Sequence, residues 1–248
     1  MHVLITGATS GIGEACARLF AAHGHTIVAT GRRQARLDAL QQDLGATHCH
    51  TLCFDVADVD ATRAALDSIP EAMRPLELVI NNAGKALGLD SFETSNWAHW
   101  DEMLAVNVRG FLAVAQWAAQ HLKAAGGGHI INVGSIAGRE VYPKGHVYCG
   151  TKHAVDAISR GMRQDLVAHH VKVSQIAPGL VDTEFSTVRF EGDTARAQAV
   201  YAGIQPLTAA DVAQTIYWMA TTPPHVHVAD VLLLPTAQAA STVVHRKS

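Results

Sequence analysis

Short apolar segments alternate along the chain with longer stretches in which apolar residues recur at helical spacing. Each short segment has the length of a strand buried on both faces, whereas the stretches between them have the period of amphipathic helices. This alternation predicts a parallel β-sheet covered by helices on both faces, the doubly wound α/β class. The expected strands are residues 2–6, 26–30, 49–54, 76–80, 128–134, 171–177 and 230–234.

Several of these strands end in loops of small or polar residues. Examples are Thr6-Gly7, Asn81-Asn82-Ala83-Gly84, Gly134-Ser135 and Pro178-Gly179. The carboxyl ends of parallel strands line the ligand crevice of an open sheet, so these loops are expected to converge on one functional edge.

Residues 181–208 form the one long interval without a clear strand. An insertion at the functional edge is either a lid over substrate or a plain surface loop, and we favour the lid. No internal repeat or long linker divides the chain, so residues 1–248 are interpreted as a single domain.

Composition and charge narrow the class of function. The 248 residues are 48% hydrophobic and 17% charged, which is typical of a globular protein with a sizeable core. The formal net charge is −3, and the basic residues are scattered. Neither nucleic acid nor an anionic membrane surface is therefore expected as a partner.

The chain has no apolar run long enough to span a bilayer, and its first apolar segment begins at once, without room for a cleavable leader. A cytoplasmic location is expected. Its four cysteines, Cys16, Cys49, Cys53 and Cys149, have no paired zinc-ligand spacing, so no metal site is predicted.

The stretch LITGATSGIGEACARLF joins the first expected strand to an amphipathic helix through Gly7, Gly11 and Gly13. Glycines permit a tight turn and a close approach of backbone N–H groups to a pyrophosphate, whose charge the helix N-terminus favours. The same spacing also occurs in simple turns, but its position between a strand and a helix favours dinucleotide binding.

The end of the second strand indicates which dinucleotide is bound. NAD sites of this architecture commonly present an acidic residue there, whereas this chain has Arg32 and Arg33, followed by Arg36. A guanidinium can bind the additional phosphate of NADP with two parallel hydrogen bonds, so NADP(H) is predicted. The alternative is a solvated helix start. Asp55, after the third strand, is expected either to contact the adenine amino group or to cap a helix.

Tyr148 and Lys152 are four residues apart in VYCGTK, a spacing that places both on one face of a helix. A phenol has a pKa of about 10, and lowering that pKa to about 7 requires about 4 kcal/mol. Two unit charges about 4 Å apart interact by about 4 kcal/mol at an effective dielectric constant of about 20. Lys152 can therefore lower the pKa of Tyr148 enough for acid–base catalysis on a carbonyl or alcohol.

Two further polar residues complete the predicted catalytic group. Ser135 follows the strand HIINVG, where its hydroxyl can donate to the same substrate oxygen as Tyr148. Asn107 lies inside an apolar helical pattern. It is either a satisfied core amide, or its carbonyl oxygen or a kinked backbone holds a water that links Lys152 to solvent.

Together these features resemble the short-chain dehydrogenase/reductase family, in order and spacing, over nearly the whole chain. The shared blocks are the glycine motif, Asn81-Asn82-Ala83-Gly84, Asn107, Ser135, Tyr148-x-x-x-Lys152 and Pro178-Gly179. The resemblance implies a Rossmann-type sheet of seven strands in the order 3-2-1-4-5-6-7. It also implies hydride transfer from a nicotinamide, the tetrad Asn107, Ser135, Tyr148 and Lys152, and a homotetramer.

The cofactor residues implied by the motifs and this resemblance share one property, which is a place at the expected functional edge. They are Gly7, Thr9, Ser10, Gly11, Ile12, Gly13, Arg32, Arg33, Asp55, Val56, Asn82, Ala83, Gly84, Tyr148, Lys152, Pro178, Gly179 and Val181.

Three stretches, ATGRRQARLDAL, NNAGKALG and GLVDTEFSTVRFEGD, are similar to bacterial NADP-dependent 3-hydroxy acid dehydrogenases. These enzymes act on serine and 3-hydroxypropionate or reduce malonic semialdehyde, and sulfoacetaldehyde reductases are related to them. The resemblance implies a short aldehyde or alcohol that bears an acidic group. Sulfoacetaldehyde is the rival substrate, and a non-catalytic NADP-sensing protein is the alternative of another class.

Such a substrate requires a cation close to Ser135 and Tyr148. Arg189, in the expected lid, is the first choice because a guanidinium binds a carboxylate or sulfonate with defined geometry. Arg139 or Lys85 is expected to assist. The alternative is a surface arginine paired with the nearby Glu191 or Asp193.

Overall fold

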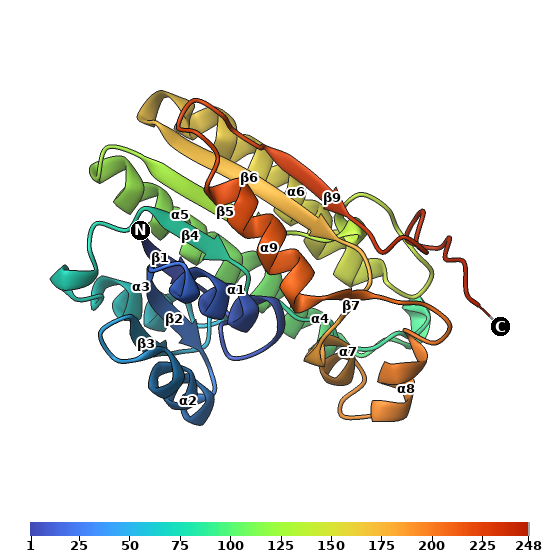
Figure 1. Ribbon diagram of the computed structural model, residues 1–248. Coiled ribbons are helices and arrows are strands. Elements are labelled where there is room, and N and C mark those ends of the chain that lie inside the picture. Colours follow the sequence, from blue (N-terminus) through green and yellow to red (C-terminus); the bar gives the residue numbers. More distant parts are fainter. Residues whose placement is uncertain (248) are drawn as a thin grey trace.

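The computed structural model describes residues 1–247, which form a seven-stranded parallel sheet in the order β3-β2-β1-β4-β5-β6-β9 (Figure 1). Because β9 is the seventh strand of this sheet along the chain, the predicted order and fold class are confirmed. The largest error in a strand boundary is at β4, predicted from residue 76 and observed from Leu78. The strands are β1 (His2–Ile5), β2 (Thr26–Gly31), β3 (Cys49–Cys53), β4 (Leu78–Asn81), β5 (Gly128–Val133), β6 (Val171–Pro178) and β9 (Asp230–Leu233).

Helices cover both faces of the sheet (Figure 1). Alternate residues of a strand point to opposite faces, so Val3 and Ile5 pack into one apolar cluster while Leu4 packs into the other. The first face carries α1 (Gly11–Ala22), α2 (Gln34–Leu44) and α9 (Ala209–Ala220). The second carries α3 (Val59–Asp67), α5 (Phe111–Ala124) and α6 (His146–Leu166).

Helix ends coincide with capping residues. The Asp58 side chain accepts a 2.9 Å hydrogen bond from the backbone N–H of Ala61 at the start of α3. At the start of α9, Thr208 and Asp211 form a reciprocal capping box. Asp58, not Asp55, therefore caps the helix after β3.

One helical stretch departs from regular geometry. Helix α4 (Trp97–Leu104) continues through a wide π-helical turn, Ala105–Gly110, into α5. The turn contains Asn107, so the polar residue in the apolar pattern does mark an irregular backbone. Single 3₁₀ turns occur at Glu71–Met73, Phe92–Thr94, Ile136–Gly138 and Val167–His169.

The interval 181–208 contains more regular structure than the sequence indicated. It begins with β7 (Val181–Asp182) and ends with β8 (Leu207–Thr208), and these two strands pair in parallel. Between them lie α7 (Glu184–Arg189) and α8 (Thr194–Ala199). The sequence predicted no strand in this interval, and that prediction is wrong. Each observed strand has only two residues, too few to produce a periodic pattern in the sequence.

No helix within residues 1–247 combines the length and the apolar character needed to cross a membrane. The same residues contain no group of three histidine, cysteine or acidic side chains placed to hold a metal ion.

Candidate active site

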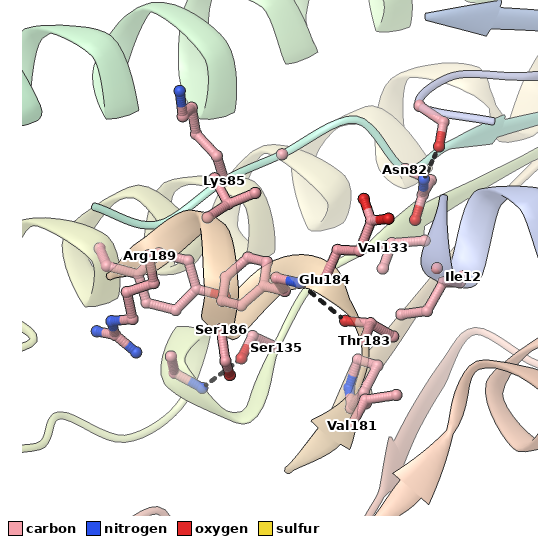
Figure 2. A pocket seen from close by; sticks show the side chains of 18 of the residues that line it. Ile12, Asn82, Lys85, Val133, Ser135, Val181, Thr183, Glu184, Ser186 and Arg189 are labelled. Atoms are coloured by element: carbon pink, nitrogen blue, oxygen red, sulfur yellow. Dashed lines mark hydrogen bonds between the residues drawn. The ribbon is translucent and has the colours of Figure 1, made fainter. Parts of the chain in front are cut away.

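A cleft of about 510 Å³ lies at the carboxyl ends of the parallel strands. Gly7, Asn82, Ser135 and Gly179, from the loops after β1, β4, β5 and β6, line it. Figure 2 shows Asn82 and Ile12 in one part of this cleft, and Ser135, Ser186 and Arg189 in another. The convergence of loops predicted from the strand pattern is thus observed.

In the glycine loop, two parts of the backbone, at Gly7 and Gly13, lie close together. Gly7 and Gly11 have positive φ angles of 68° and 53°, a region that favours glycine. A Cβ atom on Gly13 would lie 2.3 Å from the carbonyl oxygen of Gly7, so no larger residue fits. Ser10, Gly11 and Ile12, at the N-terminus of α1, line the cleft, which suits a pyrophosphate.

A second set of contacts joins this loop to the end of β4. The hydroxyl of Thr6 accepts hydrogen bonds from the backbone N–H groups of Asn82 (2.9 Å) and Ala83 (3.0 Å). The Asn82 side chain donates to the carbonyl oxygen of Thr6 at 2.8 Å. These bonds hold the floor of the cleft in one arrangement.

Three guanidinium groups gather beyond the end of β2. Arg33 donates to the side-chain oxygens of Thr9 (3.0 Å) and Ser10 (2.7 Å), and so binds the glycine loop. Arg33 and Arg36 also pair with Glu184. Glycines that admit a pyrophosphate and cations beside them fit a dinucleotide with an additional phosphate.

Arg32 and Asp55 form an ion pair of 3.1 Å, and the other oxygen of Asp55 accepts the backbone N–H of Ala57. Asp55 lines the cleft, so contact with a bound adenine stays a prediction.

Tyr148 and Lys152 both lie on α6 and are buried against the cleft. The Lys152 ammonium donates a 3.0 Å hydrogen bond to the carbonyl oxygen of Val133, and burial lowers its pKa to about 8. Burial also raises the pKa of Tyr148, and a hydrogen bond with Ser135 acts in the opposite direction. The expectation that Lys152 lowers the pKa of Tyr148 is therefore wrong for the protein alone, because desolvation of the phenolate outweighs every favourable contact.

Asn107 lies behind the cleft with its side chain hydrogen-bonded to protein groups. Its Nδ2 donates to the carbonyl oxygen of Lys85 (2.8 Å) and to Thr151 (3.1 Å), and its Oδ1 accepts the N–H of Lys85. Its amide nitrogen is satisfied by protein groups, and its Oδ1 retains a second lone pair beyond the bond from Lys85. The side-chain oxygen of Asn107 and the backbone of the π-helical turn both stay candidates for the predicted water relay.

Arg189 lies in the cleft, beside the rings of Tyr142 and Tyr148, with its guanidinium carbon 5.5 Å from each ring centre. It donates to the Tyr142 hydroxyl at 2.9 Å and to the Gly88 carbonyl at 3.2 Å. Within residues 1–247, no carboxylate pairs with it. Glu191 pairs with His99, and Asp193 caps α8, so the alternative of a surface ion pair is wrong.

Two other predicted cations are engaged elsewhere. Arg139 pairs with Asp230 on β9 and does not line the cleft, so its predicted contact with substrate is not supported. Lys85 lines the cleft, but its ammonium pairs with Glu102 of α4. Both cations pair with carboxylates that are distant in the sequence, Asp230 for Arg139 and Glu102 for Lys85, so the sequence did not indicate these pairs.

All of the predicted cofactor residues line the cleft except Thr9 and Gly13. The structure adds cleft residues that sequence reasoning missed. Among them are Tyr142, Thr183, Glu184, Ser186, Tyr201 and Gln238. Thr183, which caps α7 through its hydroxyl, carries the one usable sequence signal, that of a helix start.

Comparisons with known proteins agree with this geometry. A family model described as short chain dehydrogenase matches residues 1–194. The chain is 42% identical over 239 residues to a sulfoacetaldehyde reductase of Chromohalobacter salexigens, covering 96% of this chain and 94% of that protein. It is 40% identical over 248 residues to the NADP-dependent 3-hydroxy acid dehydrogenase YdfG of Salmonella typhi, covering 99% and 100%. A closed form of serine dehydrogenase complexed with NADP+ superposes with a TM-score of 0.94 at 38% identity, covering 99% of both chains.

Proposed function

The chain belongs to the short-chain dehydrogenase family, and from this membership we propose that it is an NADP(H)-dependent enzyme for small anionic substrates. It is an oxidoreductase, as the motifs predicted. The proposed reaction transfers a hydride between the nicotinamide and a 3-hydroxy acid or the corresponding semialdehyde. Serine, 3-hydroxypropionate and malonic semialdehyde are the candidate substrates.

The position of Arg189 carries the proposal. Its guanidinium lies beside the Tyr148 ring, and it pairs with no carboxylate of residues 1–247. A cation without an anionic partner at the edge of a cleft is suited to bind an anionic group of substrate. The distance to Tyr148 allows one small molecule to contact both residues.

Tyr148 supplies the proton. Because burial raises its pKa, the phenol is protonated at neutral pH and can donate from its hydroxyl to a substrate carbonyl oxygen. Ser135 donates a second hydrogen bond to that oxygen as negative charge develops. Lys152, one turn further along α6, would favour the phenolate in the reverse direction through its positive charge. Asn107 holds the backbone of Lys85, and a water at its side-chain oxygen or at the π-helical turn would link Lys152 to solvent.

When bound, NADP(H) supplies or accepts the hydride at this site. The glycine loop and the N-terminus of α1 would hold its pyrophosphate, and Asn82, Ala83 and Gly84 would line its middle part. Arg32, Arg33 and Arg36 would bind the 2′-phosphate of the adenosine ribose.

Sulfoacetaldehyde is the second candidate substrate. A guanidinium binds a sulfonate as readily as a carboxylate, and the reductase of Chromohalobacter salexigens is a close relative. Steady-state turnover of serine, 3-hydroxypropionate, malonic semialdehyde and sulfoacetaldehyde, each with NADP(H) and NAD(H), tests both candidates. A preference for NADP(H) with a carboxylate substrate is expected. Turnover of neutral aldehydes alone would contradict the proposal.

A non-catalytic NADP-sensing protein would retain binding without turnover. Absorbance at 340 nm with NADPH and a panel of aldehydes separates the two. A decrease with an anionic aldehyde is expected, and no change with any of them would favour the sensor.

The remaining expectations concern closure, assembly and location. We propose that residues 181–208 act as a lid, since Phe185, Ser186 and Tyr201 of this interval line the cleft. We also propose a cytoplasmic homotetramer. Its support is the partly exposed Leu104 and Leu112 on α4 and α5, and Leu232 on the edge strand β9, which are 45%, 42% and 44% exposed. Light scattering coupled to size-exclusion chromatography measures the assembly.

A further inference from the structure

Glu184 begins α7, the first helix of the interval 181–208, and its carboxylate crosses the cleft to the arginines beyond β2. One oxygen accepts from Nη1 of Arg33 at 2.9 Å and the other from Nη1 of Arg36 at 2.6 Å. The pKa of Glu184 is lowered, mainly by its hydrogen bond with Arg33. A single carboxylate thus engages two of the three guanidinium groups at that end of the cleft.

These contacts lie directly on the phosphate loop. Arg33 also donates to Ser10, and Glu184, Arg33 and Ser10 all line the cleft. The start of α7 is close to the same loop, because a Cβ atom on Gly11 would lie 3.3 Å from the Cβ of Thr183. Glu184 therefore occupies the position at which an anionic group of a bound dinucleotide would meet Arg33 and Arg36.

We propose that Glu184 is a cofactor-specificity residue that competes with the 2′-phosphate of NADP(H) for Arg33 and Arg36. This inference rests on the proposed use of NADP(H). The phosphate would take up guanidinium donors that the carboxylate now holds, and two anions beside the same two guanidinium groups repel each other, so they compete. The phosphate prevails because it carries more charge and more acceptor oxygens, whereas the pairs of Glu184 are partly exposed and weak.

Two consequences follow from this competition. Glu184 reduces the preference for the phosphorylated cofactor below the value that the arginines alone would give. Its displacement also releases the first residue of α7 from the arginines, which couples occupation of the 2′-phosphate site to the position of the interval 181–208.

The test compares two ligands that differ only in the 2′-phosphate, adenosine 2′,5′-bisphosphate and adenosine 5′-monophosphate. Their dissociation constants are measured by calorimetry with the wild-type chain and with Glu184→Gln. The variant is expected to bind the bisphosphate about three- to tenfold more tightly, with little change for the monophosphate. An unchanged or weakened preference for the bisphosphate would overturn the proposal, the weakened case showing that Glu184 orients the arginines for the phosphate instead.

Controls separate the competition from other effects. Asp182→Asn removes the same charge two residues away, at an exposed position outside the arginine contacts, and should leave both constants unchanged. Glu184→Asp shortens the side chain and should give an intermediate preference. If the wild-type chain itself shows no preference for the bisphosphate, the proposed cofactor is wrong, whereas a wild-type preference that Glu184→Gln does not increase contradicts this inference alone.

Discussion

The end of the cleft beneath α1 and the end around Tyr148 are shaped by different parts of the chain. Beneath α1 the glycine loop contributes backbone to the surface, and a Cβ atom added to Gly13 would lie 2.3 Å from the carbonyl oxygen of Gly7. Around Tyr148 the surface consists of long side chains, such as Arg189 at the end of α7, which contacts Tyr142 in the loop before α6. Backbone contacts tolerate no added atom, whereas side-chain contacts can be altered one group at a time.

The two ends of the cleft therefore depend on the sequence in different ways. The backbone end requires glycine at given positions, whatever the ligand, and so it is common to many dinucleotide-binding proteins. The side-chain end determines which molecule reacts, because charge and hydrogen-bond donors there select the substrate. Substitutions at the backbone end should therefore lower stability, whereas substitutions at the side-chain end should change turnover or substrate affinity.

The largest expected effect is at the reacting group itself. Tyr148→Phe removes the proton donor and should lower kcat by about 10²- to 10⁴-fold, with cofactor binding and the folded structure retained. Steady-state kinetics with NADPH and the preferred aldehyde measure this. Tyr142→Phe, which removes a hydroxyl from the neighbouring tyrosine, should retain most of kcat. Equal losses in both variants would contradict the assigned roles.

The backbone end should respond through stability. Gly13→Ala places a Cβ atom 2.3 Å from the Gly7 carbonyl oxygen, and the required shift of the loop should lower the free energy of unfolding by about 3 kcal/mol. Urea unfolding measures the change, and fluorescence titration should show weaker NADPH binding.

Gly161→Ala on α6 is the matched control, because no atom lies within 4 Å of the added Cβ. This variant should be more stable than the wild-type chain by about 0.5–1 kcal/mol, since alanine favours a helix over glycine. If Gly13→Ala were also stabilising, the close approach would not describe the protein in solution.

The side-chain end should respond through substrate affinity. Arg189→Ala removes a charge-assisted hydrogen bond and should raise KM for an anionic substrate about 30-fold, equivalent to about 2 kcal/mol, with a smaller effect on kcat. A neutral aldehyde of similar size should show little change. Arg196→Ala, on α8 beside Phe190 and outside the cleft, removes a guanidinium of the same segment and should leave KM unaltered. An unchanged KM for every anionic substrate in Arg189→Ala would remove the assignment.

The smallest expected effect is a pH dependence of stability, which tests whether water is excluded from Lys152. Burial lowers its pKa to about 8 from 10.5, so between these values the unfolded chain binds a proton that the folded chain lacks. Stability contributed by this group therefore rises with pH, by about 1 kcal/mol from pH 8 to pH 9.

The quantity to measure is the difference in unfolding free energy between the wild-type chain and Lys152→Met at pH 8 and pH 9. Taking the difference cancels the opposite contribution of Cys16 and Cys49, whose pKa values burial raises to about 12 and about 11. A difference that does not depend on pH would show that Lys152 is solvated.

Local patterns in the sequence determined the strands of the sheet and the glycine loop, whereas the strand order was implied by the family resemblance. Strand burial produces continuous apolar segments, and a turn with positive φ requires glycine, so both leave a signal within a few residues. The spacing of Tyr148 and Lys152 likewise follows from helical geometry alone. These features are read directly from neighbouring positions.

Only the tertiary structure decided what each polar group contacts. Arg139 pairs with Asp230, Lys85 with Glu102, and Glu184 with Arg33, and no pattern in the sequence relates the members of these pairs. The direction of the Tyr148 pKa was also decided by burial, which depends on every element packed around it. Periodicity reports how one residue relates to its neighbours, whereas ion pairs and desolvation depend on distances between segments that only folding brings together.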